Sequence, residues 1–359
     1  MLMSQKRKRP GGLGRYSILP RTALAIFLVT VIAGKSGLAA GPEARLNQYA
    51  GRLRPALAAF FDVLRGDEPE KAPETHLPAG QLVYESAAPA LPEKPKAEAD
   101  DVRSLTIDGA SGEYQGGGDV YVRNDTDYAI DIPALLASPD KVRLSGDRVQ
   151  VLIMHTHGTE AYAMTDDSRY TPSDADRTTD SRFNVLRVGQ EICDILNARG
   201  IKTVHSETLN DSPAYAGSYS RALEDISKYI KDNPSIKLVL DVHRDAMVTS
   251  SGVKYKAVAD IGGEQAAQMM LVCGTDAGGL VHDGWRDNLC FQLKLQQRIN
   301  GRYPELMRPL NLRAARFNQH VTPGSMLLEV GTSGNTLEEA LRSARLFADV
   351  LADMLLERR

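Results

Sequence analysis

Apolar runs and segments with helical periodicity alternate from residue 149 to the end of the chain. The nearly unbroken apolar run at 236–242 is typical of a central parallel strand that is covered on both faces. Further strands are predicted at 149–154, 201–204, 254–259, 269–273, 312–317 and 326–330. Helices are predicted at 181–199, 219–231 and 285–302, and a last helix begins near Asn335, where Glu338 suits a capping box. This order predicts an α/β fold, a three-layer domain with a mainly parallel sheet over residues 149–359.

The first 148 residues divide into four segments of different composition. Residues 1–40 place a basic stretch before the apolar run 23–34, which predicts a single-pass anchor in the cell membrane with the rest of the chain outside the cytoplasm. Lys35 interrupts the apolar stretch and Leu38-Ala39-Ala40 resembles a cleavage site, so a cleaved signal peptide with secretion is the alternative. Residues 41–65 predict a juxtamembrane helix, 66–100 a proline-rich linker, and 101–148 short strands, at 119–122 and 129–132, that lead into the main domain.

Composition and missing motifs exclude several functional classes. The net charge is −3, which gives no support to nucleic-acid binding. The three cysteines, Cys193, Cys273 and Cys290, contain no CxxC pair, so neither a zinc ribbon nor a disulfide scaffold is expected. No G-x-S-x-G elbow, phosphate-binding loop or H-E-x-x-H helix occurs. These absences argue against a serine hydrolase, a nucleotide-binding enzyme and the common form of zinc peptidase.

Histidines and a glutamate gather after the first predicted strand, at a place where sites form in open α/β sheets. His155 and His157 point to the same side of an extended segment, and Gly158 lets the chain turn so that Glu160 comes close. Imidazoles beside a carboxylate are typical ligands of zinc. The segment therefore predicts part of a hydrolytic zinc centre, and the alternative is a hydrogen-bonded polar cluster without a metal.

His243 follows the central predicted strand and is the natural ligand from the far side of such a centre. Asp241 or Asp245 could orient its imidazole through the second ring nitrogen. Arg244 could grip a carboxylate of the substrate or polarise a scissile carbonyl, which makes it a candidate catalytic residue. The alternative is a surface Arg–Asp pair beside a core histidine.

Glu329 lies at the end of the last predicted strand, between two apolar residues. Burial is expected to raise the pKa of this carboxyl, which suits a general base that accepts a proton from metal-bound water. The alternative is a structural acid that pairs with Arg316 or Arg342. A groove for sugar or peptide could be lined by Tyr162, Tyr215, Tyr219, Trp285 and Asn288, although core packing is the safer expectation for at least half of them.

Seven separated motifs of the chain resemble those of stage II sporulation protein P, in the expected order over 149–359. They are 154–162, 184–189, 218–221, 241–246, Trp285 with 288–289, 317–319 and 328–336. The resemblance implies a zinc-dependent N-acetylmuramoyl-L-alanine amidase with the fold of the zinc amidases. Such an enzyme cleaves peptidoglycan between N-acetylmuramic acid and L-alanine of the stem peptide, with peptide cross-links as a further target, during engulfment of the forespore.

The resemblance also implies roles for residues and partners. It makes His157 and His243 zinc ligands and Glu329 the catalytic acid/base, and it leaves Glu160 and Asp180 as alternatives for the acidic ligand. His155 is either a ligand or a neighbour of one. The implied partners are stage II sporulation protein D, stage II sporulation protein M and the membrane. The alternative function is a non-catalytic peptidoglycan-binding scaffold that recruits another cell-wall hydrolase.

Overall fold

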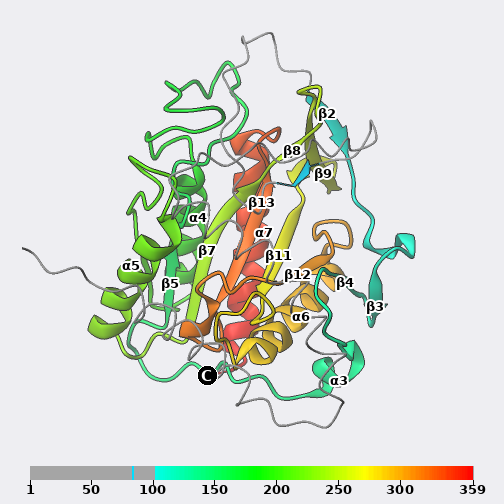
Figure 1. Ribbon diagram of the computed structural model, residues 1–359, viewed down its shortest axis with the longest axis vertical. Helices are drawn as coiled ribbons and strands as arrows, with labels where there is room; N and C mark the ends of the chain where they lie inside the picture. Colours follow the sequence, from blue (N-terminus) through cyan, green and yellow to red (C-terminus); the bar gives the residue numbers. More distant parts are fainter. Residues whose placement is uncertain (1–82, 85–101, 359) are drawn as a thin grey trace, which may run out of the picture. The chain divides into compact units, whose positions relative to one another are not determined.

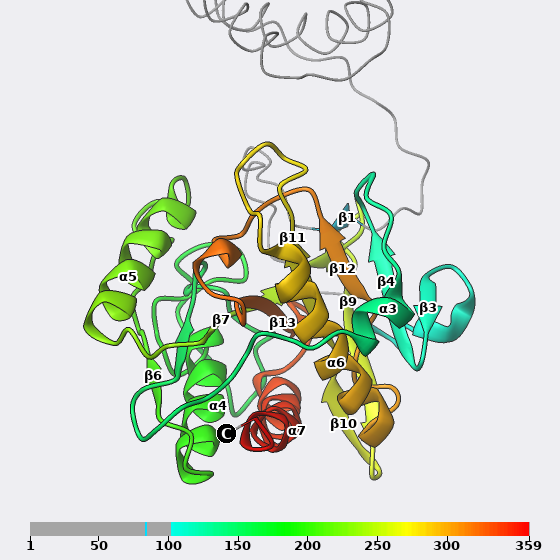
Figure 2. The ribbon, with the colours of Figure 1, turned by 90° about the horizontal axis from the view of Figure 1, so that it is seen from below.

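A computed structural model describes residues 83–84 and 102–358 of the chain, and these residues form two sheets with five α-helices (Figures 1 and 2). The larger sheet has eight strands in the order β3-β4-β12-β11-β13-β7-β5-β6. Its strands, along the chain, are β3 (Gln115–Gly117), β4 (Val120–Asn124), β5 (Val151–Met154), β6 (Thr203–His205), β7 (Leu238–Asp245), β11 (Met269–Gly274), β12 (Leu310–Arg313) and β13 (Met326–Thr332). All neighbouring pairs are parallel except β11 with β13 and β3 with β4. The predicted α/β fold with a mainly parallel sheet is confirmed.

Helices lie on both faces of this sheet. They are α3 (Ile132–Ala137), α4 (Val185–Ala198), α5 (Ser218–Asp232), α6 (Trp285–Arg302) and α7 (Leu337–Leu356). Figure 2 shows α4, α6 and α7 together on one face and α5 on the other, beside β5. The sheet with a helical layer on either side gives the three-layer arrangement that the βαβα order predicts.

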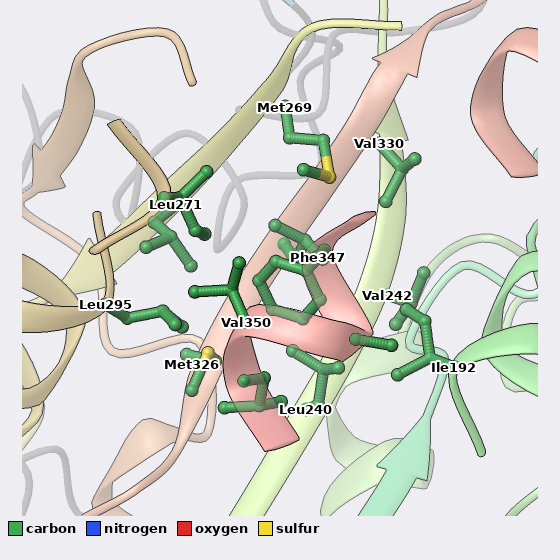
Figure 3. Close-up of a cluster of buried hydrophobic side chains, with 14 of the residues drawn as sticks. Ile192, Leu240, Val242, Met269, Leu271, Leu295, Met326, Val330, Phe347 and Val350 are labelled. Carbon is green, nitrogen blue, oxygen red and sulfur yellow. The ribbon is translucent and has the colours of Figure 1, made fainter. Parts of the chain in front are cut away.

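The main core lies between the sheet and the layer formed by α4, α6 and α7. Phe347 and Val350 of α7 meet Leu240 and Val242 of β7 there, with Ile192 of α4 alongside (Figure 3). A smaller cluster on the opposite face joins α5 to Leu152 and Met154 of β5 and to Val239 of β7. Successive residues of β5 and β7 thus enter different cores, which is why these strands are apolar without interruption.

A second, smaller sheet lies beside the first. It consists of β1 (Val83–Tyr84), β2 (Val102–Leu105), β8 (Met247–Val248), β9 (Lys254–Ile261) and β10 (Glu264–Ala267). The strand predicted at 254–259 therefore exists, but it pairs with β10 and β8 in antiparallel register and with β2 in parallel register. Within 102–358, no helix is long and apolar enough to cross a membrane.

Several predicted element ends are wrong, for local reasons. The segment 129–132 forms no strand, because Asp131 caps α3 through the backbone N–H of Ala134. The helix predicted from 181 begins at Val185, after the cap residue Asn184. The capping box of α7 is formed by Thr336 and Glu339, one residue later than predicted. Strand β7 runs on through His243, so this residue lies within the strand rather than after it, and β13 extends to Thr332, beyond the predicted end at residue 330.

Of the segments before residue 101, the structure describes only residues 83–84. The anchor or signal at 1–40 and the juxtamembrane helix at 41–65 lie outside the described residues. Of the linker at 66–100, only Val83–Tyr84 is described, as the short strand β1 paired with β8. In the segment 101–148, β4 joins the main sheet as the parallel neighbour of β12.

Candidate functional site

The face of the main sheet opposite α7 carries the predicted site. Glu329 of β13 is the register partner of His243 on β7 and of Met270 on β11. Because their neighbours Leu328 and Val242 enter the core, both Glu329 and His243 point to the opposite face. Helix α5 packs on β5 and the start of β7, and the site lies further along this face. A cavity of about 280 Å³ lies there, lined by His157, Glu160, Tyr219, His243, Arg313 and Glu329 among others.

The loop after β5 brings His157 and Glu160 to the cavity. A Cβ atom at Gly158 would lie 2.9 Å from a methyl group of Leu209 and 3.0 Å from one of Leu186, so a larger residue at this turn would require these leucine side chains to move. Thr159 donates to the carboxylate of Asp211 through its backbone N–H, at 3.2 Å, and through its hydroxyl. The hydrogen bonds of Thr159 to Asp211 therefore hold the turn in place, with the predicted ligands His157 and Glu160 on either side of it.

Arg177 closes the outer side of this loop. Its guanidinium donates to Asp211 at 2.9 Å and lies 3.7 Å from Glu160. Burial alone would raise the pKa of Glu160, but His243, Arg244 and Arg177 outweigh it and hold the pKa below its usual range. Glu160 is therefore an ionised carboxylate at neutral pH.

His243 lies between two carboxylates. Its Nδ1 is 3.4 Å from Glu160 Oε2, and its Nε2 is 2.9 Å from Asp241 Oδ1, an ion-pair distance without the angle of a hydrogen bond. Burial alone would lower the pKa of His243, but Asp241 and Glu160 outweigh it and hold the pKa well above 6.5. The imidazole therefore carries a proton, and the residue that contacts its second nitrogen is Asp241 rather than Asp245.

Glu329 has a carboxylate oxygen without a partner. Its Oε2 is buried and forms no hydrogen bond. Burial, with the neighbouring charge of Asp245, raises the pKa of Glu329 to about 8. Neither arginine that could have made it a structural acid contacts it: Arg342 pairs with Glu264, and Arg316 donates to the carbonyl of Val281.

Arg244 is placed differently from its predicted role. Its guanidinium donates to the carbonyls of Ala161 and Asp176, both at 2.8 Å, and its backbone N–H donates to Glu160 at 3.0 Å. Arg244 lines the cavity, but these bonds commit its side chain to the loop that carries Glu160. The geometry favours a positioning residue over the predicted contact with a carbonyl or carboxylate of the substrate.

Comparison with known proteins agrees with the sequence motifs. The family model of stage II sporulation protein P matches residues 84–352. The chain belongs to the stage II sporulation protein P family. Stage II sporulation protein P of Bacillus subtilis strain 168 is 28% identical over 221 residues, which cover 58% of this chain and 52% of that relative. The alignment thus spans about half the length of the curated relative.

Solved structures of amidases are also similar to this member of the stage II sporulation protein P family. The N-acetylmuramoyl-L-alanine amidase AmiC2 of Nostoc punctiforme aligns with a TM-score of 0.33 and 13% identity, over 59% of this chain and 97% of that one. An N-acetylmuramoyl-L-alanine amidase of Clostridium difficile 630 aligns with a TM-score of 0.32 and 12% identity, over 59% of this chain and 97% of that one. TM-scores this low do not decide an activity.

Two residues implied by the stage II sporulation protein P motifs lie away from the cavity. His155 is fully buried, with Nε2 2.8 Å from Nε2 of His205 and Nδ1 2.8 Å from the carbonyl of Val242. Asp180 forms an ion pair of 2.6 Å with Arg182. Neither His155 nor Asp180 lines the cavity. Of the two alternatives for the acidic residue, the structure therefore brings Glu160, and not Asp180, to the two histidines.

Aromatic residues divide as expected between cavity and core. Tyr215 stacks on His157 with ring centroids 4.4 Å apart, and Tyr219 meets the same ring edge-on at 5.6 Å. Tyr162, Trp285 and Asn288 are buried instead. Sequence reasoning missed Arg177, Asp211, Asn311 and Arg313, because they come from loops and a short strand that carry no motif.

The side chains of His157, Glu160 and His243 are of the types that bind a divalent cation, although their present arrangement does not surround one. Among the residues that the structure describes, no group of three or more His, Cys, Asp or Glu side chains is arranged to hold a metal ion. Nδ1 of His157 is nevertheless buried without a hydrogen-bond partner, and burial lowers the pKa of His157 to about 3, which keeps the ring neutral. The 3.4 Å between His243 and Glu160 is close to the roughly 3.3 Å that separates two tetrahedral ligands of zinc.

Proposed function

We propose that this protein is a zinc-dependent peptidoglycan hydrolase that cleaves the amide bond between N-acetylmuramic acid and the L-alanine of the stem peptide. The observation that carries the proposal is the unpartnered, buried Oε2 of Glu329, which faces one cavity with His157, Glu160 and His243. Such an acid is costly to keep without a partner unless it performs chemistry. Membership of the stage II sporulation protein P family supports a role in sporulation.

His157, Glu160 and His243 would hold the zinc ion. When bound, zinc would lower the pKa of a water molecule and polarise the scissile carbonyl. The support for this ligand set is the neutral ring of His157 with its unpartnered Nδ1, together with the proton that His243 holds between Glu160 and Asp241. A cation at that place can replace the proton, because the two carboxylates already favour positive charge there.

Glu329 is the general base in this proposal and then the general acid. Its carboxylate takes a proton from the attacking water and returns the proton to the nitrogen of the leaving amine. The pKa of about 8 lies near neutral pH, which suits a group that must both accept and return a proton. Arg244 acts through Glu160, because its backbone N–H and guanidinium hold the loop on which Glu160 lies.

Membrane attachment and partners are further proposals that rest on the sequence and the family resemblance. We propose that residues 1–40 hold the hydrolase at the outer face of the cell membrane, with cleavage and secretion as the alternative. Stage II sporulation proteins D and M are the proposed partners. Cell fractionation with an antibody against the last helix distinguishes an anchored chain from a secreted one by its size and fraction.

Digestion of purified peptidoglycan sacculi by the full chain tests the proposed function. The amidase predicts release of peptides with a free L-alanine amine, resolved by mass, that stops with a chelator and with Glu329→Gln. Fragments that end at peptide cross-links instead would identify an endopeptidase. Sacculi that bind the protein in the presence of zinc but stay intact would overturn the proposal in favour of the scaffold.

A further inference from the structure

We propose that Arg308 and Asn311 form a second subsite, which binds a carboxylate of the stem peptide about three residues beyond the scissile amide. The inference rests on the proposed function, since it names a feature of the substrate that the same cavity would recognise. The subsite lies on the sheet face beyond Glu329, on strands β11, β12 and β4.

One continuous sheet face leads from the hydrolytic site to this subsite. Glu329 is the register partner of Met270, and Val272, two residues further along β11, is the partner of Asn311 on β12. Asn311 is in turn the partner of Arg123 on β4. Direct partners and residues two apart share a face, so all of these side chains point to the same side as Glu329.

A small cavity continues the main one along this face. It has a volume of about 30 Å³ and is lined by Arg308, Asn311, Met270 and Arg123 among others. Met270 and Asn311 also line the main cavity, so the two cavities lie next to each other. Among the residues described, the lining of the small cavity includes two arginines and no acidic side chain. The cavity therefore has space for a small group, and the arginine side chains on its wall are hydrogen-bond donors.

The buried polar atoms at this place lack partners. Arg308 is 1% exposed and donates through Nη1 to Asp245 at 2.8 Å, while its Nε and Nη2 form no hydrogen bond. Asn311 is 6% exposed, and its Oδ1 has no partner either. Leaving these buried polar atoms, two donors of Arg308 and one acceptor of Asn311, unpaired costs free energy, so the arrangement is expected to be completed by a ligand.

The unpaired atoms of Arg308 determine the kind of ligand. Nε and Nη2 lie on the same edge of the planar guanidinium and point in the same direction, which matches the two oxygens of a carboxylate. Asp245 already neutralises the charge of Arg308 through the other edge. The subsite therefore recognises a carboxylate by its shape and by two parallel hydrogen bonds.

Spacing in the sheet places this carboxylate on the peptide. Asn311 lies two strands from Glu329, or about 10 Å at the usual distance between strands. An extended peptide covers about 10 Å in three residues. A peptide that is cleaved at Glu329 and runs along the sheet face thus brings its third residue to Asn311, which lines the small cavity together with Arg308.

Calorimetric binding to the full chain with Glu329→Gln tests the subsite, because this variant is not expected to cleave the probe. The two probes are a muramoyl tripeptide with a free carboxylate on its third residue and the same compound with that group as a primary amide. The acid is expected to bind about tenfold more tightly than the amide, since charge-assisted hydrogen bonds are lost with the amide. Equal affinities would overturn the subsite.

Further variants, made in the same Glu329→Gln chain, assign the preference to the proposed residues. Arg308→Lys keeps a positive charge beside Asp245 but has no second edge, and it is expected to abolish the preference for the acid. Asn311→Asp adds a like charge and should weaken binding of the acid without weakening that of the amide. Arg302→Lys, a change at a half-exposed arginine of α6, should keep the tenfold preference.

The outcomes separate the subsite from the proposed function. A preference that persists in both Arg308→Lys and Asn311→Asp would overturn the subsite and leave the amidase standing. If the wild-type chain cleaves no peptidoglycan while the Glu329→Gln chain still binds the acid preferentially, the amidase is overturned and the subsite stands. Binding of neither compound would count against both.

Discussion

Glu329 of β13 and His243 of β7 are direct partners in the register of two parallel strands. The proposed acid/base and one proposed zinc ligand are therefore held by the hydrogen-bonded ladder of the sheet, and not by loops. Glu160 comes from a loop, but the backbone N–H of Arg244, the residue after His243, binds its carboxylate. Three functional groups are thus fixed relative to one short stretch of β7, which is the precision that a catalytic site requires.

Glu329→Gln is expected to lower hydrolysis of peptidoglycan by about 10²- to 10⁴-fold, because it removes the group that moves the proton. The same change is expected to raise the melting temperature in the presence of chelator at neutral pH. Burial raises the pKa of Glu329 to about 8, so folding opposes its ionisation, and glutamine resembles the protonated acid. Rates of product release and thermal unfolding check the two effects. Glu338→Gln, at an exposed position of α7, is the control and should change neither.

Zinc is expected to stabilise the wild-type chain against heat. A ligand that binds only the folded state at a hundredfold excess over its Kd adds about 3 kcal/mol to the free energy of unfolding. His157→Asn should remove most of this gain, because it replaces a proposed ligand. His320→Asn, which changes an exposed histidine, is expected to keep it. An equal gain in all three proteins would place the zinc elsewhere.

Asp140 is predicted to make stability depend on acid pH. Burial alone would raise the pKa of this carboxyl, but Arg358, Lys294 and Arg143 outweigh it and lower the pKa. Because the folded pKa is depressed, the stabilisation is present above the unfolded pKa and is lost as the pH falls through the folded pKa. Asp140→Asn should therefore cost about 2 kcal/mol at pH 7, and the difference should shrink toward pH 3.

Urea unfolding of the wild type and Asp140→Asn at several pH values checks this dependence. Asp166→Asn, at a side chain that is 95% exposed, is the matched control and should cost little at any pH. A cost for Asp140→Asn that stays constant down to pH 3 would show that the ion pairs are not its source.

Gly331 is required by the backbone of β13 beyond Glu329. It has φ of +71°, and a Cβ atom there would lie 2.9 Å from both Ala267 Cβ and Asn335 Oδ1. Gly331→Ala is expected to destabilise the protein by about 1 to 3 kcal/mol through strain and contact. Gly301→Ala in α6, where no atom lies within 4 Å, should be neutral or stabilise by up to about 1 kcal/mol. The denaturant midpoint should therefore fall in Gly331→Ala and stay the same or rise in Gly301→Ala.

Sequence alone predicted most elements of the fold but not their partners. Apolar runs located β5, β7, β11 and β13 well, because both faces of these strands are buried. A run of apolar residues does not determine which strand lies beside it, so nothing indicated that β11 is antiparallel to β13 or that β9 belongs to another sheet. The strand predicted at 129–132 was wrong because its alternating pattern fits a strand, whereas the cap at Asp131 favours a helix.

The candidate site was predictable where residues project from the sheet. His157, His243 and Glu329 come from or directly follow strands whose order the βαβα pattern implies, and they line one cavity. Arg244 was given a contact with substrate because its backbone position is near the site, but its side chain reaches the carbonyls of Ala161 and Asp176. A side chain with several rotatable bonds can satisfy different partners from one position, and the sequence does not say which.

The proposed function requires that His157, Glu160 and His243 hold a zinc ion beside Glu329. Crystals of the full chain grown with zinc, with diffraction recorded on both sides of the zinc absorption edge, test it most directly. We expect one strong anomalous peak among these three side chains, with Glu329 close enough to reach a water molecule on the ion. A peak at His155 and His205, or at Asp180, or no peak with zinc in excess, would contradict it.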